Sequence, residues 1–466
     1  MRDRVGEIRA RGGELAIVGN GGPSFAAAFR EDQGIDGPLL VDPELRAYRA
    51  AGLRRGRVEI LSPRLASNAL RAFRGGYRQV GVQGDPWQLG GVFVIRPGGA
   101  LAYRHLSREA GDHPPVDEIV AALAPDAPEI VEQEESSPVV RLVGRGLSRL
   151  VDASVVLSFD RTGFAVHSLA FDPQDLQVEM GSRRCLVTGA NSGIGFETAQ
   201  ALADLGAEVV LLCRNAERGE QAVARIREAT GSRRVSLEVL DVSDLAAIRR
   251  VAPRLAERPI DVLVHNAGVL PVERTVTADG LELSLATHVA GPFLLTQLLR
   301  PALEAASGAR VIFVSSGGML TRRLQARDPN WTERAYDGVT AYAETKRAQV
   351  VLAELFAERL RRAGVVVHSM HPGWADTPAV RSSLPGFHRV TRAILRSPAE
   401  GADTVVWLAA SEKAGLSTGL FYFDREPRRT HWLPGTRESR EERERLWTLC
   451  EEWTGAGPRR ESGSRA

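Results

Sequence analysis

The chain has 466 residues, of which 43% are hydrophobic and 25% charged, and its net charge is +2. This length predicts two or more domains, and the weak, interleaved charge argues against a nucleic-acid-binding protein. No apolar run reaches about 18 residues and no signal-peptide core follows the amino terminus, so we expect a cytoplasmic protein without a membrane span. Cys185, Cys213 and Cys450 show neither a metal-ligand spacing nor a disulfide framework.

The first part of the chain, residues 1–125, is predicted to alternate strands and helices. We expect strands at Leu15–Gly19, Leu39–Asp42, Gly91–Ile95 and Ala100–Arg104, and helices at Phe25–Arg30, Pro43–Ala51 and Pro115–Leu123. Pro97–Gly99 would form the hairpin turn between the last two strands. This order resembles the later part of a thioredoxin fold, specifically the peroxiredoxin-like (AhpC/TSA-type) family.

The peroxiredoxin-like resemblance is incomplete at the reactive cysteine. In that family a central strand and a cysteine-bearing turn precede the element that corresponds to Val5–Arg11, and this sequence has neither. Peroxide or thiol chemistry would therefore have no nucleophile here. Either the start codon has been placed too late, or a relic domain is kept for folding or association. We favour the first and expect a truncated domain, because a sheet without its central strand should be poorly stable.

Residues 126–179 are predicted to connect two domains. Pro125–Pro138 is rich in Pro, Glu and Ser, and Val139–Ala153 has the pattern of an amphipathic helix, with arginines four residues apart. That helix could touch a membrane surface or, as we favour, pack against the second domain. We expect the second domain over residues 180–455 and a disordered tail over 456–466.

The second domain begins with a glycine-rich run between a strand, Cys185–Val187, and a helix, Phe196–Leu205. Glycines at such a junction permit a tight turn and let backbone N–H groups approach a pyrophosphate at the positive end of the helix. The residues expected to contact a dinucleotide here are Thr188, Gly189, Asn191, Ser192, Gly193, Ile194 and Gly195.

The next strand, Glu208–Leu212, indicates which dinucleotide is bound. An NAD-selective site usually has an acid after this strand, to accept from the ribose 2′-hydroxyl. This chain has Arg214 there instead, where a 2′-phosphate would lie. We therefore predict NADP(H), with NAD less favoured; alternatively, Arg214 is one more solvated arginine in an arginine-rich protein.

Four further motifs follow in a set order: Leu240–Val242, His265–Gly268, Val314–Ser316 and Tyr342–Lys346. Together with the glycine run they resemble the short-chain dehydrogenase/reductase family, over about residues 180–450. The residues at 315–320 and 370–378 are most similar to its dehydrogenase/reductase member 12 branch. The resemblance implies a Rossmann fold, a doubly wound parallel sheet with helices on both faces. It also implies cofactor contacts from Asp241, Val242, Asn266, Ala267, Gly268, Tyr342, Lys346, Pro372, Gly373 and Thr377.

Tyr342 and Lys346 are four residues apart, so on a helix they lie on one face. A tyrosine has a pKa near ~10, and an ammonium about 4 Å away would lower it by roughly three units at an effective dielectric of ~20. The phenol of Tyr342 would then titrate near ~7, where a general acid/base works best. Ser316 would hydrogen-bond the substrate carbonyl, and Lys346 would also bind the nicotinamide ribose. Of 60 basic residues only Lys346 and Lys413 are lysines, so a lysine at this position of the motif is unlikely to be accidental. An exposed i,i+4 polar pair is the alternative.

His288 stands where the family usually has an asparagine that holds a water behind the lysine. Histidine can donate and accept, so it could support a proton relay, and its charge could respond to pH between about 5 and 8. A packed helix histidine with no catalytic part is the alternative.

These features predict hydride transfer between NADP(H) and a small-molecule carbonyl or secondary alcohol. The segments 317–338 and 382–392 would roof the substrate pocket, and Met319, Trp374, Leu384 and Phe387 would make it apolar, which favours a lipophilic substrate. A non-catalytic NADP(H) sensor or scaffold and a redox fusion that couples NADPH to the peroxiredoxin-like part are the alternatives. The protein could form a homo-oligomer.

Overall fold

The computed structural model describes residues 4–20, 23–35, 37–42, 90–96, 101–107, 114–124, 158–377, 385–392, 394–433 and 435–456, and also 45, 47, 48, 51, 53, 148, 152 and 381. The chain divides into two compact units, Met1–Gln133 and Glu134–Ala466. Each is described by itself.

The first unit is a small α/β unit. Its described elements are α1 (Val5–Ala10), β1 (Ile17–Gly19), α2 (Pro23–Gln33), β2 (Leu39–Val41), β3 (Gly91–Ile95), β4 (Leu101–Leu106) and α5 (Val116–Ala121). Strands β1 and β2 pair in parallel and β3 and β4 pair antiparallel. Ile8 is buried, and Val94, Ala102, Ile119 and Ala122 form a small apolar cluster. The expected strands and helices are present, except that the helix Pro43–Ala51 and the turn Pro97–Gly99 fall wholly or mostly outside the described residues.

The second unit is built on an eight-stranded sheet. Its strands are β5 (Arg184–Thr188), β6 (Glu208–Cys213), β7 (Val235–Val239), β8 (Val262–His265), β9 (Arg310–Val314), β10 (Val366–His371), β11 (Phe421–Phe423) and β12 (Glu426–Pro427). They lie in the order β12-β11-β10-β9-β8-β5-β6-β7, and every pair is parallel except β11 with β12. Every residue of β5, β8 and β9 is buried, as expected for parallel strands covered on both faces.

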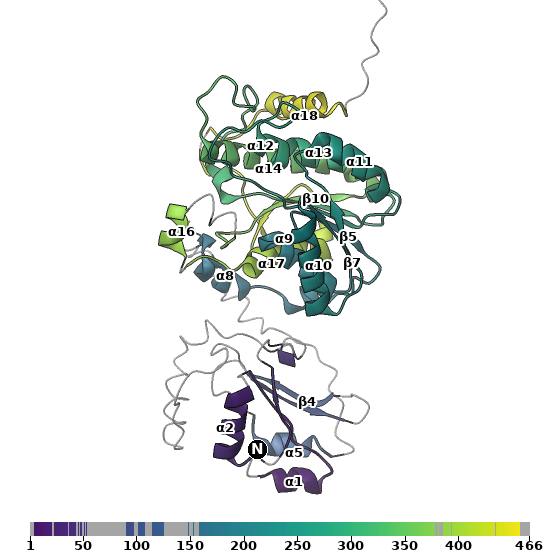
Figure 1. The fold of residues 1–466 in the computed structure, drawn as a ribbon, viewed down its shortest axis with the longest axis vertical. Coiled ribbons are helices and arrows are strands. Elements are labelled where there is room, and N and C mark those ends of the chain that lie inside the picture. The colour runs from purple at the N-terminus through teal and green to yellow at the C-terminus, as the bar shows by residue number, and fades with distance from the viewer. Residues whose placement is uncertain are drawn as a thin grey trace, which may run out of the picture. The chain divides into compact units, whose positions relative to one another are not determined.

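Helices cover both faces of this sheet (Figure 1). One face carries α9 (Gly193–Asp204), α10 (Ala216–Thr230) and α17 (Pro398–Ala410), and the other carries α11 (Leu245–Leu255), α13 (Gly291–Glu304), α14 (Gly338–Leu360) and α18 (Arg440–Thr454). The shorter elements are α8 (Arg161–Ser168), η3 (Pro173–Leu176), α12 (Leu283–Leu285), the π-helical turn η4 (Ala286–Ala290), η5 (Gly317–Thr321), η6 (Arg361–Ala363), α16 (Pro385–Thr391) and η7 (Lys413–Leu416). The predicted fold class, a doubly wound parallel sheet preceded by a thioredoxin-like part, is confirmed.

The strand order positions the site. The chain winds from β5 outward to β7, then returns to β8 on the other side of β5 and winds outward again to β10. Loops at the carboxyl ends of β5 and β8 therefore separate in opposite directions, and ligands of such sheets bind in the crevice that this reversal opens.

The structure describes only part of the connecting segment. The amphipathic helix expected at Val139–Ala153 lies outside the described residues, apart from Ser148 and Asp152. The helix α8, with Asp160 as its amino-terminal cap, was not predicted. This helix belongs to the second unit. Among the described residues, no helix combines the length and apolar character needed to cross a membrane.

Candidate active site

A cavity of about 540 Å³ opens at the carboxyl ends of the parallel strands. Most of the residues predicted to form the site line it. They are Gly189, Asn191, Ser192, Gly193, Ile194, Arg214, Asp241, Val242, Asn266, Ala267, Gly268, Ser316, Tyr342, Lys346, Pro372, Gly373 and Thr377. Of the residues predicted to be catalytic or to bind the cofactor, Thr188, Gly195 and His288 do not line it.

The glycine turn after β5 depends on two left-handed backbone conformations and one close approach. Gly189 has φ +64° and Gly193 has φ +57°, backbone conformations that favour glycine. At Gly195 a Cβ would overlap the side chain of Asn266, so helix α9 can come this near to the loop after β8 only without one. Gly193 and Ile194, the first residues of α9, line the cavity, so the backbone N–H groups of the first turn, which have no partner within the helix, lie at its wall.

Thr188 does not line the cavity but holds together two of the loops that do. Its buried hydroxyl oxygen accepts hydrogen bonds from the backbone N–H groups of Asn266, at 2.9 Å, and Ala267, at 3.0 Å. The side-chain amide of Asn266 donates to the carbonyl of Thr188 at 2.9 Å. These bonds join the loops after β5 and β8 into one surface, so Thr188 shapes the cavity without lining it.

Two arginines stand at the β6 end of the cavity. Arg214 follows β6 and is exposed, and Arg218, one turn into α10, lines the same cavity. The side chain of Asn215 caps this helix by accepting from the backbone N–H of Arg218 at 2.8 Å. Sequence reasoning missed Arg218, although its i,i+4 spacing from Arg214 was a usable signal. The two guanidinium groups make this end of the cavity positive.

Tyr342 and Lys346 project from α14 into the opposite part of the cavity, beside Ser316 at the end of β9. Lys346 is buried, and its ammonium donates to the carbonyl of Val314 and to the side-chain oxygen of Gln349, both at 2.9 Å. Burial lowers the pKa of Lys346 to about 7. Burial also raises the pKa of Tyr342, although a hydrogen bond with Ser316 opposes that shift.

The expectation that Lys346 brings the pKa of Tyr342 near neutrality is therefore wrong. The Lys346 nitrogen lies 5.6 Å from the centre of the Tyr342 ring. Its protons are directed at two other acceptors, and desolvation disfavours the charged forms of both residues. At neutral pH the site thus holds a neutral phenol beside a lysine that is only partly charged.

His288 is held by two hydrogen bonds behind Tyr342. Its Nε2 accepts from the backbone N–H of Val269 at 3.0 Å, so Nδ1 carries the proton and donates to the hydroxyl of Thr345 at 2.8 Å. That hydroxyl in turn donates to the carbonyl of Tyr342. The imidazole packs edge-on against the Tyr342 ring, with centroids 5.4 Å apart.

Full burial, reinforced by the neighbouring Lys346, lowers the pKa of His288 far below its usual value. The expected change of charge between pH 5 and 8 is therefore wrong. Both ring nitrogens already have partners in the protein, which supports the packed-histidine alternative. His288 orders the helix turn that carries Tyr342.

The backbone around His288 is a π-helical turn, Ala286–Ala290, followed by Gly291. A Cβ on Gly291 would overlap the carbonyl oxygen of Val242, which lines the cavity. Such turns often occur at functional sites because they displace side chains from the regular helical register. Here the turn and the glycine bring the start of α13 directly against the loop after β7.

The substrate side of the cavity is partly as expected. Trp374 lines it, together with Val269 and Leu270, which sequence reasoning missed. Met319 does not line it: its side chain is fully buried in an apolar cluster against which Trp374 packs. Its sulfur accepts from the guanidinium of Arg347. The side chains of Leu384 and Phe387 lie outside the described residues.

A doubly wound α/β fold with Ser316, Tyr342 and Lys346 at its carboxyl edge defines an oxidoreductase of the dehydrogenase/reductase class. The family model for short chain dehydrogenase matches residues 183–386, and the model for AhpC/TSA antioxidant enzyme matches residues 1–109.

Dehydrogenase/reductase SDR family member 12 of Bos taurus is 42% identical over 299 residues, which are 63% of this chain and 93% of that protein. The Homo sapiens member 12 is 40% identical, again over 63% of this chain and 93% of that protein. Human retinol dehydrogenase 13 is 33% identical over 60% of this chain and 84% of its own length. The chain belongs to the short-chain dehydrogenase/reductase family.

Proposed function

We propose that this protein is an NADP(H)-dependent oxidoreductase that transfers hydride between the nicotinamide and a carbonyl compound or secondary alcohol. One observation carries the proposal. Ser316, Tyr342 and Lys346 line the same cavity as the glycine turn after β5 and the arginines after β6. A cofactor-binding surface and an acid/base group thus meet in one place.

The donors along the cavity fit NADP(H). In strand order, Arg214 and Arg218 follow β6, the amides of the glycine turn follow β5, and Ser316 follows β9. Guanidinium groups suit the 2′-phosphate, helix amino-terminal amides suit the pyrophosphate, and Lys346 and Tyr342 suit the nicotinamide ribose. No carboxylate takes the place of Arg214 after β6. These residues therefore support NADP(H) over NAD(H).

The proton chemistry belongs to Tyr342. The bound cofactor supplies or accepts the hydride, and the protein's residues handle the proton. In carbonyl reduction the neutral phenol of Tyr342 donates its proton to the substrate oxygen, while the hydroxyl of Ser316 donates a hydrogen bond to that oxygen. A protonated Lys346 stabilises the negative charge left on the phenol. Because burial raises the pKa of Tyr342, the phenol carries its proton at neutral pH, which is the form that can donate it.

The substrate class follows from the walls near Tyr342. Val269, Leu270 and Trp374 are apolar and lie in the same cavity. A lipophilic group can be buried against such side chains without either surface giving up hydrogen bonds to water. We propose a lipophilic aldehyde, ketone or secondary alcohol.

The experiment is a comparison of Tyr342→Phe with wild type, using NADPH and a panel of aliphatic and aromatic carbonyl compounds. The substitution removes the transferable proton and keeps the ring, so kcat should fall about 100- to 10,000-fold while the Kd for NADPH stays unchanged. Tyr422→Phe is the matched control, because Tyr422 is buried in β11 and hydrogen-bonds Ser417. Its kcat should equal that of wild type.

The results also separate the alternatives. Tight NADPH binding by wild type without turnover of any carbonyl in the panel would favour a sensor. Retained activity in Tyr342→Phe would contradict the role of Tyr342. A redox fusion needs a reactive thiolate, whereas all three cysteines of this sequence are buried, and burial raises their pKa values, that of Cys213 to about 11.

A further inference from the structure

The segment Pro372–Thr377, which follows β10, is one wall of the cavity. Two other parts of the chain hold its backbone. The N–H of Trp374 donates to the carbonyl of Phe159 at 2.8 Å, and the carbonyl of Trp374 accepts from the N–H of Arg396 at 2.8 Å. The N–H of Asp376 donates back to the carbonyl of Arg396 at 2.8 Å. The conformation of this wall therefore depends on where residues 159 and 396 are placed.

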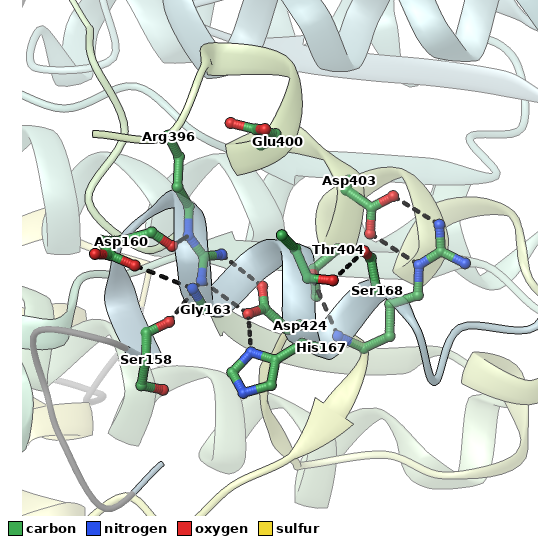
Figure 2. A network of polar contacts seen from close by, with 12 residues as sticks. Ser158, Asp160, Gly163, His167, Ser168, Arg396, Glu400, Asp403, Thr404 and Asp424 are labelled. Atoms are coloured by element: carbon green, nitrogen blue, oxygen red, sulfur yellow. Dashed lines mark hydrogen bonds and ion pairs between the residues drawn. The ribbon is translucent and has the colours of Figure 1, made fainter. Parts of the chain in front are cut away.

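The side chain of Arg396 lies directly under this wall. It is completely buried, and a Cβ on Gly373 would overlap its guanidinium group. The guanidinium donates to the carbonyls of Asp160, at 3.0 Å, and Ser158, at 2.8 Å (Figure 2). It also donates to both carboxylate oxygens of Asp424, at 2.6 and 2.8 Å.

Asp424 is itself held from two sides. With Arg425 it forms the tight turn between β11 and β12, and both residues have positive φ, +49° and +60°. That conformation is unfavourable for residues other than glycine, so side-chain contacts must stabilise it. Besides Arg396, His167 of α8 hydrogen-bonds the Asp424 carboxylate through Nδ1 at 2.5 Å, and its Nε2 lies 3.1 Å from Asp152.

Apolar packing joins the same segments. The Phe159 ring packs edge-on against Trp374, with centroids 6.1 Å apart, and against Phe423, at 5.1 Å. The guanidinium of Arg396 stands 4.8 Å from the centre of the Phe423 ring. Residues 158–167, 396 and 424 all lie outside the part of the chain that the short-chain dehydrogenase model matches. Residues 158–167, which precede the matched part of the second unit, thus help to support this wall.

We propose that Arg396 is a positioning residue for the reductase reaction. It locks the Pro372–Thr377 wall against residues 158–160 and Asp424, and thereby sets where the substrate and the nicotinamide half of the cofactor lie relative to Tyr342. Arginine suits this role because its planar group can donate to two carbonyls and a carboxylate at once, whereas an ammonium cannot reach all of them. The proposal rests on the proposed function.

The location of Arg396 predicts which ligand contacts it affects. The wall follows β10, whereas Arg214 and Arg218 follow β6, four strands further along the order β10-β9-β8-β5-β6. Loosening the wall should therefore disturb the reacting end of the cavity and spare the 2′-phosphate end. Intact NADPH spans both ends, and 2′,5′-ADP is a probe for the second end alone.

The experiment compares Arg396→Lys with Arg425→Lys in the full chain. Arg425 is a matched control, since it neighbours Asp424 in the same turn and makes a bidentate pair with Asp403 at 2.6 and 2.8 Å. Asp403 lies to one side of the Arg396 group (Figure 2). For each variant, kcat, KM and the Kd values for NADPH and 2′,5′-ADP would be measured, along with urea unfolding.

Arg396→Lys should lower kcat about 10- to 100-fold, because small misplacement at a reacting centre costs this much. The Kd for NADPH should rise about 2- to 10-fold, as for one lost hydrogen bond, and the Kd for 2′,5′-ADP should not change. Arg425→Lys should match wild type in all four quantities. If Arg396→Lys matches Arg425→Lys in kcat and NADPH affinity, or weakens the two ligands equally, the inference is overturned.

A lysine under Gly373 could prevent folding, because removing one partner of a buried ion pair is strongly destabilising. His167→Phe then decides the question, since it keeps a ring beside Phe423 and removes only the bonds to Asp424 and Asp152. It should lower kcat with no change in the Kd for 2′,5′-ADP, and an unchanged kcat would refute the inference. If wild type binds neither NADPH nor 2′,5′-ADP, the proposed function itself fails, a result distinct from any variant-specific one.

Discussion

Lys346 should titrate several pH units below an ordinary lysine. Its side chain is 3% exposed, and desolvation lowers its pKa from 10.5 to about 7. A difference of about 3.5 units corresponds to roughly 5 kcal/mol of penalty on the charged form, at about 1.4 kcal/mol per unit.

The lowered pKa of Lys346 predicts how the free energy of unfolding depends on pH. Folded Lys346 binds its proton only below about pH 7, whereas the unfolded chain binds it up to the ordinary value of 10.5. Between these values the unfolded state binds more protons, so the free energy of unfolding rises with pH. From pH 7 to about 9 the contribution is roughly 2 kcal/mol. Lys346→Met should lack this rise, and subtracting its urea-unfolding free energies from those of wild type removes the contribution of every other titrating group.

The composition of the chain offers a direct assay. Only two lysines occur, so protein labelled with carbon-13 at lysine Cε shows two signals by NMR. Lys413 is the internal control: it is half-exposed, and hydrogen bonds to Asp172 and Asp175 raise its pKa above 10.5. Lys346 should titrate near 7 and Lys413 above its ordinary value. A Lys346 midpoint above about 9, or parallel stability curves for wild type and Lys346→Met, would refute the desolvation argument.

Three further predictions concern the cofactor end, the histidine and the π-helical turn. Arg214→Ala and Arg218→Ala should each weaken NADPH about 10- to 100-fold and leave NADH nearly unchanged, and equal losses for both cofactors in competition assays would count against a 2′-phosphate contact. The His288 ring signals should not shift in NMR spectra between about pH 5 and 8, because the imidazole is buried and neutral; a midpoint in that range would contradict this. Gly291→Ala should lower the free energy of unfolding by about 1–3 kcal/mol or more in urea titrations, because the new methyl group meets the Val242 carbonyl, and an unchanged midpoint would show that the backbone can yield.

Much of the second unit could be predicted because its signals are local. Short stretches of sequence are enough to predict the strand before Gly189 and the helix after it. The same holds for the position after β6, where Arg214 replaces an acidic residue. Parallel strands bring their carboxyl ends to one edge, so motifs far apart in the sequence could be expected to meet there. The thioredoxin-like order of the first unit was predicted on the same kind of local pattern.

The sequence by itself determined the family, the order of the strands' functional loops, and the side chains that those loops carry into the cavity. The tertiary structure alone decided how these groups behave. Whether Lys346 is charged, whether Tyr342 is acidic and whether His288 can titrate depend on burial and on partners brought by other elements. The contacts of Arg396 could not be predicted from the sequence either. They join residues 158–160, 373, 396 and 424, which no spacing rule connects. Desolvation and long-range hydrogen bonds exist only once the chain has folded, and they set the protonation states and the rigidity of the site.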